Sequence, residues 1–352
     1  MKESTSLSLG GILLGIGIGW IVFQSIDVTF NVFAAILIIS GIGLILTSLS
    51  YRMGFTLPIR GLIGGLILSL VLTSGLDFIN VSGNWNFSST GTMTLTNIVT
   101  TDRVYLEIDN FNGPIQVSTW DKAEYRIDLE IKARGSSQKE AKEYVDEFNV
   151  DFDESEDQDQ KRLLLKYVVP LLARSRYSIK VTVSFPASAS LDLDLDSTNG
   201  QISLTNINGN DLKLTTSNGP LIFDNVYGKD ISGKTSNGGI EGGVDAKYAS
   251  LSTNNARVKI TISCTYSGEY YLKTSNGDIE LLISPSLQAG YDLDLSTSNG
   301  NIDIDLTDLR FFENQRTNKK AQTEEFDNKA IRMIIQASTS NANIKIKRLS
   351  RI

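Results

Sequence analysis

The residues of this chain that could do chemistry are mainly carboxylates, since the sequence has no histidine and one cysteine. Aspartate alternates with leucine or isoleucine in three segments, at 191–196, 292–295 and 302–305. Five of these aspartates are candidate calcium ligands: Asp192, Asp194, Asp196, Asp303 and Asp305. Residues two apart on a strand share a face, and calcium takes roughly six to eight oxygen ligands. Paired carboxylates on stacked strands could also act on polysaccharides. The same alternation places these side chains on a solvent face opposite the leucines, which is the interpretation we favour.

The absent histidine removes several kinds of site. Ser-His-Asp and Cys-His nucleophilic systems and histidine-ligated metal sites all require it. The single Cys264 cannot form an internal disulfide, and we expect it to be a small buried hydrophobic residue. We therefore predict no catalytic residue and no cofactor apart from the calcium candidates. A carbohydrate-active enzyme is kept as an alternative.

A recurring phrase, Thr-Ser-Asn-Gly or a close variant, supplies the second set of candidate residues. Its asparagines are Asn199, Asn218, Asn237, Asn255, Asn276, Asn299 and Asn341, and alanine replaces glycine after Asn255 and Asn341. The spacings are 19, 19, 18, 21, 23 and 42 residues. A fixed period near 20 residues is the signature of a repeat architecture.

The residues around each asparagine predict strands. An aliphatic residue follows three positions later in every copy, and apolar residues alternate on both sides of the phrase. Period two indicates a strand with one buried face. Asn-Gly also favours a hairpin, so an antiparallel meander competes with a parallel solenoid. We favour the solenoid, because its stacked coils let the asparagines form a hydrogen-bonded turn ladder. A flat polar platform for glycans is the alternative use of that ladder.

The rest of the β region divides into three parts. Residues 80–101 are expected to be a spacer or first strands, residues 102–190 a strand–helix–strand opening unit, and residues 191–352 the solenoid repeats. Ser137 to Glu140 fits a capping box, which predicts one amphipathic helix to about Asn149. The acidic run 151–160 is expected to be a hairpin loop. The polar insertion 307–328 is expected to be a loop leaving one coil.

Residues 1–79 predict a membrane anchor of three helices, at about 7–26, 28–49 and 61–79. These runs are almost wholly apolar, and about 20 apolar residues span a bilayer. Arg52 and Arg60 lie between the second and third runs, so the positive-inside bias places the N-terminus in the cytoplasm and residues 80–352 outside. Gly11, Gly15 and Gly19 form a small-residue row suited to helix packing, within one chain or in a homo-oligomer.

The charge balance excludes one class of partner. The chain has 33 Lys and Arg against 40 Asp and Glu, a net charge of −7. An acidic chain without a basic stripe does not attract nucleic acid. We therefore expect the bilayer and an envelope glycan or protein as partners.

The segments Val181–Pro186 and Leu191–Leu195, followed by the Asn-Gly phrases, resemble the putative-adhesin domain family of bacteria and archaea. The resemblance covers residues 104–349 and implies an extracytoplasmic β-helix-like domain, often tethered to membrane helices. It implies no catalytic or binding residues. The insertion 307–328 and the two Ala-for-Gly repeats depart from the family pattern.

The sequence thus predicts a mainly β protein: a β-solenoid with one amphipathic helix near its start, preceded by three transmembrane helices. We expect a membrane-anchored, surface-exposed binding, adhesion or envelope-structural module. A regulatory envelope protein coupled to membrane partners and a polysaccharide-active enzyme remain as alternatives.

Overall fold

The computed structural model describes residues 66, 85–157, 159–284 and 286–349. The three expected membrane helices fall outside these residues, apart from the helical Leu66. Among the described residues no helix has the length and apolar character needed to cross a membrane. The chain divides into two units, Met1–Asn86 and Phe87–Ile352, and the second is described below.

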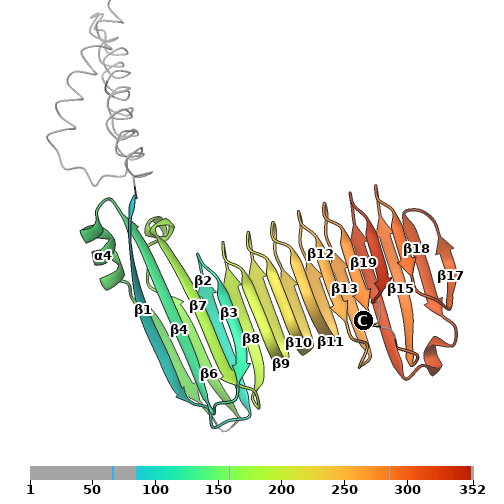
Figure 1. The fold of residues 1–352 in the computed structure, drawn as a ribbon, viewed down its shortest axis with the longest axis horizontal. Helices are drawn as coiled ribbons and strands as arrows, with labels where there is room; N and C mark the ends of the chain where they lie inside the picture. The colour runs from blue at the N-terminus through green and yellow to red at the C-terminus, as the bar shows by residue number, and fades with distance from the viewer. Residues whose placement is uncertain (1–65, 67–84, 158, 285, 350–352) are drawn as a thin grey trace, which may run out of the picture. The chain divides into compact units, whose positions relative to one another are not determined.

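The second unit is a stack of β-coils built from two facing sheets (Figure 1). Hydrogen bonding orders the first sheet as follows: β1 (Phe87–Ile98), β4 (Glu124–Gly135), β7 (Tyr177–Pro186), β3 (Ile115–Trp120), the first halves of β9 (Ile202–Thr216), β10 (Leu221–Lys234) and β11 (Ile240–Ser252), then β12 (Val258–Ile262), β14 (Ile279–Ile283), β20 (Ile344–Arg348) and β16 (Ile302–Asp305).

The second sheet follows the same stack. Its order is β5 (Val150–Glu156), β6 (Gln160–Tyr167), β2 (Arg103–Asn110), β8 (Ser190–Ser197), the second halves of β9, β10 and β11, then β13 (Gly268–Lys273), β19 (Ile331–Thr339), β15 (Ala289–Thr297), β18 (Asn318–Thr323) and β17 (Leu309–Asn314).

The repeats pair in parallel, so the solenoid is confirmed and the antiparallel meander is wrong. Equivalent residues stack directly: Ile202 pairs with Leu221, and Leu221 with Ile240. The alternating Ile and Leu side chains of both sheets are buried in one continuous core. The second turn of each repeat is a bend inside one long strand in β9, β10 and β11, rather than a separate loop.

The last repeat of the sequence is not the last coil of the stack. Strand β19 pairs with β13 on one side and β15 on the other, and β20 lies in the same way between β14 and β16. The C-terminal segment is therefore threaded between two coils that precede it in the sequence. Sequence spacing could not reveal this order, because residues 289–305 and 331–348 carry the same repeat pattern.

The insertion 307–328 is a correction to our expectation. It forms the hairpin β17–β18, whose second strand pairs antiparallel with β15, followed by the short 3-10 helix η2 (Phe326–Asn328). The insertion thus extends the second sheet instead of leaving it as a loop. Ala321 and Thr323 alternate as buried residues and supply the face that makes this pairing favourable.

Three further expectations are refined at the opposite end. Residues 85–101 contain a full strand, β1. Helix α4 (Gln138–Asp146) is capped by Ser137, whose hydroxyl accepts a hydrogen bond from the Glu140 amide, but it ends at Asp146 rather than near Asn149. The hairpin around the acidic run is present, yet residues 151–156 belong to strand β5. Asp151 and Asp153 are exposed and alternate with the half-buried Phe152 and Glu154, and the whole segment pairs with β6.

Candidate functional site: a basic pocket at the end of the asparagine ladder

The seven asparagines of the repeat phrase stack into one ladder on the turn edge. Each side-chain amide donates to the next carbonyl oxygen: Asn218 to Asn199 at 2.6 Å, Asn237 to Asn218 at 2.8 Å, Asn255 to Asn237 at 2.7 Å, Asn276 to Asn255 at 2.9 Å, Asn341 to Asn276 at 2.8 Å and Asn299 to Asn341 at 2.8 Å. The ladder follows the threaded coil order, so Asn341 precedes Asn299.

Buried hydroxyls support each rung from inside. The Thr216 hydroxyl accepts the Gly219 amide at 3.1 Å and donates to the Gly200 carbonyl of the neighbouring coil at 3.1 Å. The same pair of bonds recurs at Thr235 and Thr274. The hydroxyl that recurs in the phrase therefore closes the turn and links two coils.

The ladder has a direction. Every amide nitrogen donates toward the N-terminal end of the stack, where Asn199 Nδ2 reaches the Phe111 carbonyl oxygen at 3.5 Å. Aligned amide dipoles leave their positive ends at Asn199. This end is electrostatically suited to an anion, as oriented N–H groups are elsewhere in proteins.

A second, shorter ladder escaped the sequence analysis. Asn206 and Asn225 occupy the bend of β9 and β10 in left-handed conformation, with φ of 55° and 56°, and Asn225 Nδ2 donates to Asn206 Oδ1 at 2.8 Å. Asparagine tolerates positive φ better than most residues. A signal was present, since both residues follow a ladder asparagine by seven positions.

The five candidate aspartates divide between distant parts of the stack. Asp192, Asp194 and Asp196 lie on β8 in the second sheet, whereas Asp303 and Asp305 lie on β16 in the first sheet, opposite Lys345 and Lys347. In the part of the chain that the structure describes, no three acidic or cysteine side chains gather as a metal site.

Each β8 aspartate has its own surroundings. Asp192 is buried and accepts from Arg103 Nη2 and Gln160 Nε2, both at 2.9 Å. Asp194 forms an ion pair with Lys213 at 2.9 Å. Desolvation raises the pKa of Asp196, and the charges of Asp109 and Asp194 raise it further. Asp196 is exposed on an open strand face.

Cys264 is buried, and burial raises the pKa of its thiol to about 11. The thiol is therefore protonated near neutral pH and is a poor nucleophile. Its φ of 55° places it in the left-handed region of a turn between β12 and β13.

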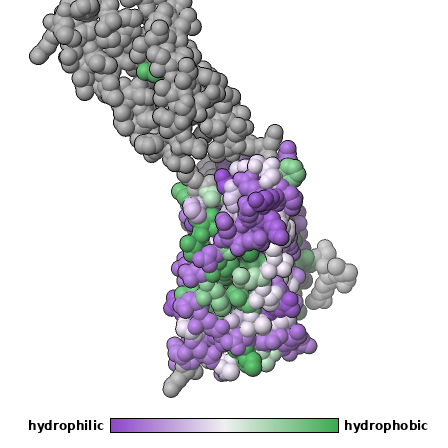
Figure 2. Space-filling model, turned by 90° about the vertical axis from the view of Figure 1, so that its left-hand side faces the viewer, coloured by the Kyte–Doolittle hydropathy of each residue, from purple (hydrophilic) through white to green (hydrophobic). Residues whose placement is uncertain are grey.

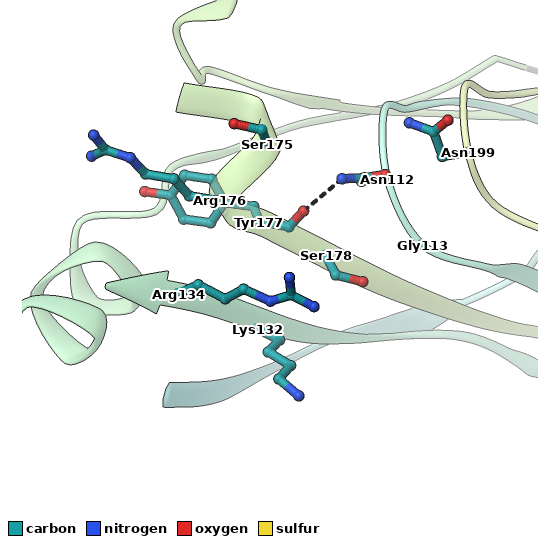
Figure 3. A pocket seen from close by; sticks show the side chains of 9 residues that line it. All are labelled: Asn112, Gly113, Lys132, Arg134, Ser175, Arg176, Tyr177, Ser178 and Asn199. Atoms are coloured by element: carbon teal, nitrogen blue, oxygen red, sulfur yellow. Dashed lines mark hydrogen bonds between the residues drawn. The ribbon is translucent and has the colours of Figure 1, made fainter. Parts of the chain in front are cut away.

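The N-terminal end of the ladder opens on a cavity of about 260 Å³ (Figure 3). Its lining comes from four elements: Asn112 and Gly113 in the β2–β3 turn, Lys132 and Arg134 at the end of β4, Ser175 to Ser178 where the 3-10 helix η1 (Leu171–Arg176) joins β7, and Asn199 in the β8–β9 turn. Sequence reasoning missed this site, because segments some 90 residues apart in the chain build it.

Backbone geometry fixes the pocket walls. Asn112 Nδ2 donates to the Tyr177 carbonyl at 3.1 Å (Figure 3), and the buried Asn110 amide donates to the carbonyls of Gly113 and Ile179 at 3.0 and 2.9 Å. Gly113 has φ of 108°, and a Cβ there would meet the Ile179 carbonyl oxygen at 2.2 Å. The turn must therefore be glycine for β3 and β7 to approach.

The pocket is basic. Lys132 and Arg134 are exposed, and neither side chain forms an ion pair or hydrogen bond with any residue that the structure describes. Arg176 differs, because its guanidinium donates to the Tyr144 hydroxyl and lies 4.8 Å from that ring. Two free cations, neighbouring Ser178, and the donor end of the ladder are complementary to a carboxylate or phosphate.

Comparison with known proteins bears on the fold. The profile of the Toastrack DUF4097 family matches residues 103–268 and, in an overlapping second match, residues 187–347. No curated protein matches the chain.

Several solved structures are similar to this one. A putative cell adhesion protein from Clostridium sporogenes has 8% identity and a TM-score of 0.38, over 74% of this chain and 100% of that one. A putative adhesin from Bacteroides fragilis has 14% identity and a TM-score of 0.31, over 73% and 98%. A putative lipid binding protein from Parabacteroides distasonis has 10% identity and a TM-score of 0.29, over 75% and 97%.

Proposed function

This chain belongs to the Toastrack DUF4097 family, and on that premise we propose that it is a membrane-anchored, surface-exposed and non-catalytic binding module. The observation that carries the proposal is the basic pocket at the donor end of the asparagine ladder. We propose that the pocket holds a carboxylate or phosphate group of an envelope polymer.

The charge distribution supports an anionic ligand. The chain carries a net charge of −7, yet Lys132 and Arg134 stand together without an acidic partner among the described residues. An incoming anion would gain charge-assisted hydrogen bonds from Arg134 and donors from Asn112 and Ser178.

Rigidity supports binding rather than turnover. The pocket walls are turns and strand ends fixed by backbone hydrogen bonds. Among the described residues, no basic side chain is hydrogen-bonded to the Ser175 or Ser178 hydroxyl of the lining, as activation of a serine nucleophile would require. The proposed anchor is residues 1–79, whose apolar runs and Arg52 and Arg60 favour an external position for residues 80–352. Protease treatment of intact cells checks this orientation, because the β domain should then be cleaved.

Calorimetric titration of the purified full chain tests the pocket, with inorganic phosphate and an oligogalacturonate as probes. We expect saturable binding of at least one probe, weakened as salt rises. Arg134→Ala and Lys132→Ala should each weaken it roughly ten-fold, and Arg134→Lys should weaken it less than Arg134→Ala.

Lys234→Ala is the matched control, since Lys234 is also exposed but lies on β10 away from the pocket. Equal binding by the Arg134→Ala variant and the unchanged protein would contradict the proposal. The two probes separate a carboxylate from a phosphate ligand.

A further inference from the structure

Four tyrosines gather on the outside of the middle coils, away from the basic pocket. They are Tyr227 on β10, Tyr248 on β11, Tyr266 in the β12–β13 turn and Tyr271 on β13, and together they are called the tyrosine strip below. The exposed fractions of Tyr227, Tyr248 and Tyr266 are 37%, 40% and 59%. Tyr271 is half-buried.

The rings are held in two pairs. Tyr227 and Tyr266 have ring centroids 5.2 Å apart at an interplanar angle of 54°, and Tyr248 and Tyr271 are 5.2 Å apart at 39°. Partners in each pair come from different coils. Ring–ring contact therefore orders side chains that would otherwise move freely on the surface, which lowers the entropy cost of binding.

The core does not require these rings. The buried side of the same strands is filled by residues such as Val226, Ala249 and Leu272. Among the described residues, only Tyr271 of the four tyrosines uses its hydroxyl in a side-chain hydrogen bond, to Glu269 at 3.3 Å. Grouped exposed aromatic side chains mark interaction sites on protein surfaces.

Polar side chains flank the rings in register. Tyr248 lies between Asp230 and Glu269 on the neighbouring strands, and Ser250 lies beside Tyr271. These groups accept and donate hydrogen bonds at a spacing set by the coils, about 4.8 Å. The carboxylates disfavour an anionic ligand, so this surface differs chemically from the basic pocket.

We propose that the tyrosine strip binds an uncharged glycan chain. The ring faces of Tyr248 and Tyr271 contact the C–H faces of successive pyranose units, while Asp230, Glu269 and Ser250 bind their hydroxyls. The chain runs along the stack axis, since Tyr248 and Tyr271 lie on the neighbouring strands β11 and β13. This site is independent of the pocket proposed above.

The test uses the purified full chain and a hexamer of β-1,4-linked N-acetylglucosamine, with binding followed by calorimetry and saturation-transfer NMR. We expect saturable binding, transfer to the sugar C–H protons, and a loss of roughly ten-fold in affinity for Tyr248→Ala and for Tyr271→Ala. Tyr248→Phe keeps the ring and should stay within about three-fold of the unchanged protein.

Phe312→Ala is the matched control, because Phe312 is an exposed aromatic residue (63%) on the C-terminal hairpin outside the strip. Arg134→Ala should leave this binding unchanged, which separates the strip from the pocket. Absence of saturable binding, or equal affinity of the Tyr248→Ala variant, overturns the proposal. If the Tyr248→Ala variant keeps its affinity for the glycan and instead loses the binding of a protein partner, the proposal is overturned as well.

Discussion

The two ends of the stack are closed in different ways. At the N-terminal end the chain is capped by local structure: the β5–β6 hairpin on one sheet, the antiparallel β1–β4–β7 group on the other, and α4 packed on β1 and β4. At the other end the coil order departs from the chain order, because β19 and β20 enter between coils that precede them in the sequence, and the β17–β18 hairpin ends the second sheet. Figure 2, viewed from the N-terminal side, shows apolar side chains surrounded by polar ones on the first of these ends.

The two ends of the stack are therefore stabilised by different interactions. The N-terminal cap includes a buried charge, Lys161, whose ammonium lies 2.8 Å from Glu154 and 2.9 Å from Glu156 and donates to the Ile98 carbonyl at 2.8 Å. The C-terminal end relies on the buried apolar side chains of the coil formed by β19 and β20, which is enclosed by a coil on each side. Point changes should therefore damage the first end, and removal of a segment should damage the second.

Ending the chain at Asn328 should have the largest effect. It removes Met333, Ile335, Ala337, Ile344 and Ile346, all buried. Their combined burial contributes on the order of 10 kcal/mol, which is comparable to the whole stability of a typical domain. Circular dichroism and thermal unfolding should show loss of cooperative structure, and a synthetic peptide of residues 329–352 should restore part of it. A truncated chain that melts like the full one would mean that this segment is peripheral.

Lys161→Ala should cost about 3 kcal/mol in the free energy of unfolding, since it leaves Glu154 and Glu156 without their buried partner. Chemical denaturation of the full chain measures it. The matched control is Lys347→Ala at the other end, whose ion pair with Glu280 is half-exposed and should contribute less than about 1 kcal/mol. Equal effects of both variants would remove the contrast between the ends.

Gly219→Ala should destabilise by about 1–3 kcal/mol, because the new Cβ would meet the Gly200 carbonyl oxygen at 1.8 Å in an overpacked turn between two coils. Gly300→Ala makes the same 1.8 Å approach, to Ala342. Its coil lies at the end of the first sheet and can move outward, so we expect a smaller loss. Thermal melts of the two variants measured together decide this, and a greater loss at Gly300 would contradict it.

Asp196→Asn should have the smallest effect on stability, and it should stabilise the protein instead of destabilising it. The pKa of Asp196 is raised from 3.8, so its ionised form is disfavoured in the fold and stability falls as pH rises through that pKa. The variant should melt slightly higher at pH 7, and the gain should vanish below about pH 3.8. Asp303→Asn, opposite Lys345 at the other end, should bring no gain. A pH series of melting temperatures compares the two.

The sequence predicted the coil well and the coil order poorly. Ile202, Leu221 and Ile240 share a phase with Asn199, Asn218 and Asn237, and local alternation alone was enough to place them in stacked strands. The threading of Asn341 between Asn276 and Asn299 depends on which of two equivalent repeats meets β13, and neither pattern nor spacing encodes that choice.

The pocket shows a similar limit. Lys132 and Arg134 have no unusual spacing, and they become a site only because Asn112 and Asn199 arrive from other segments. The asparagines, in contrast, could be identified because they recur in the sequence at a spacing of about 20 residues. Residues that carry a periodic architecture are visible in sequence, whereas residues that meet across it are not.

The enclosed C-terminal coil also limits how this molecule can change length. Units of the kind that runs from Ile202 to Pro220 share one pitch and one turn, so a duplicated unit can be inserted among β9, β10 and β11 with its neighbours preserved. A unit added after β20 would not continue the stack, because β20 already lies between β14 and β16. Evolution and protein engineering can therefore lengthen this scaffold in its middle, and the distance between its two ends is the adjustable dimension.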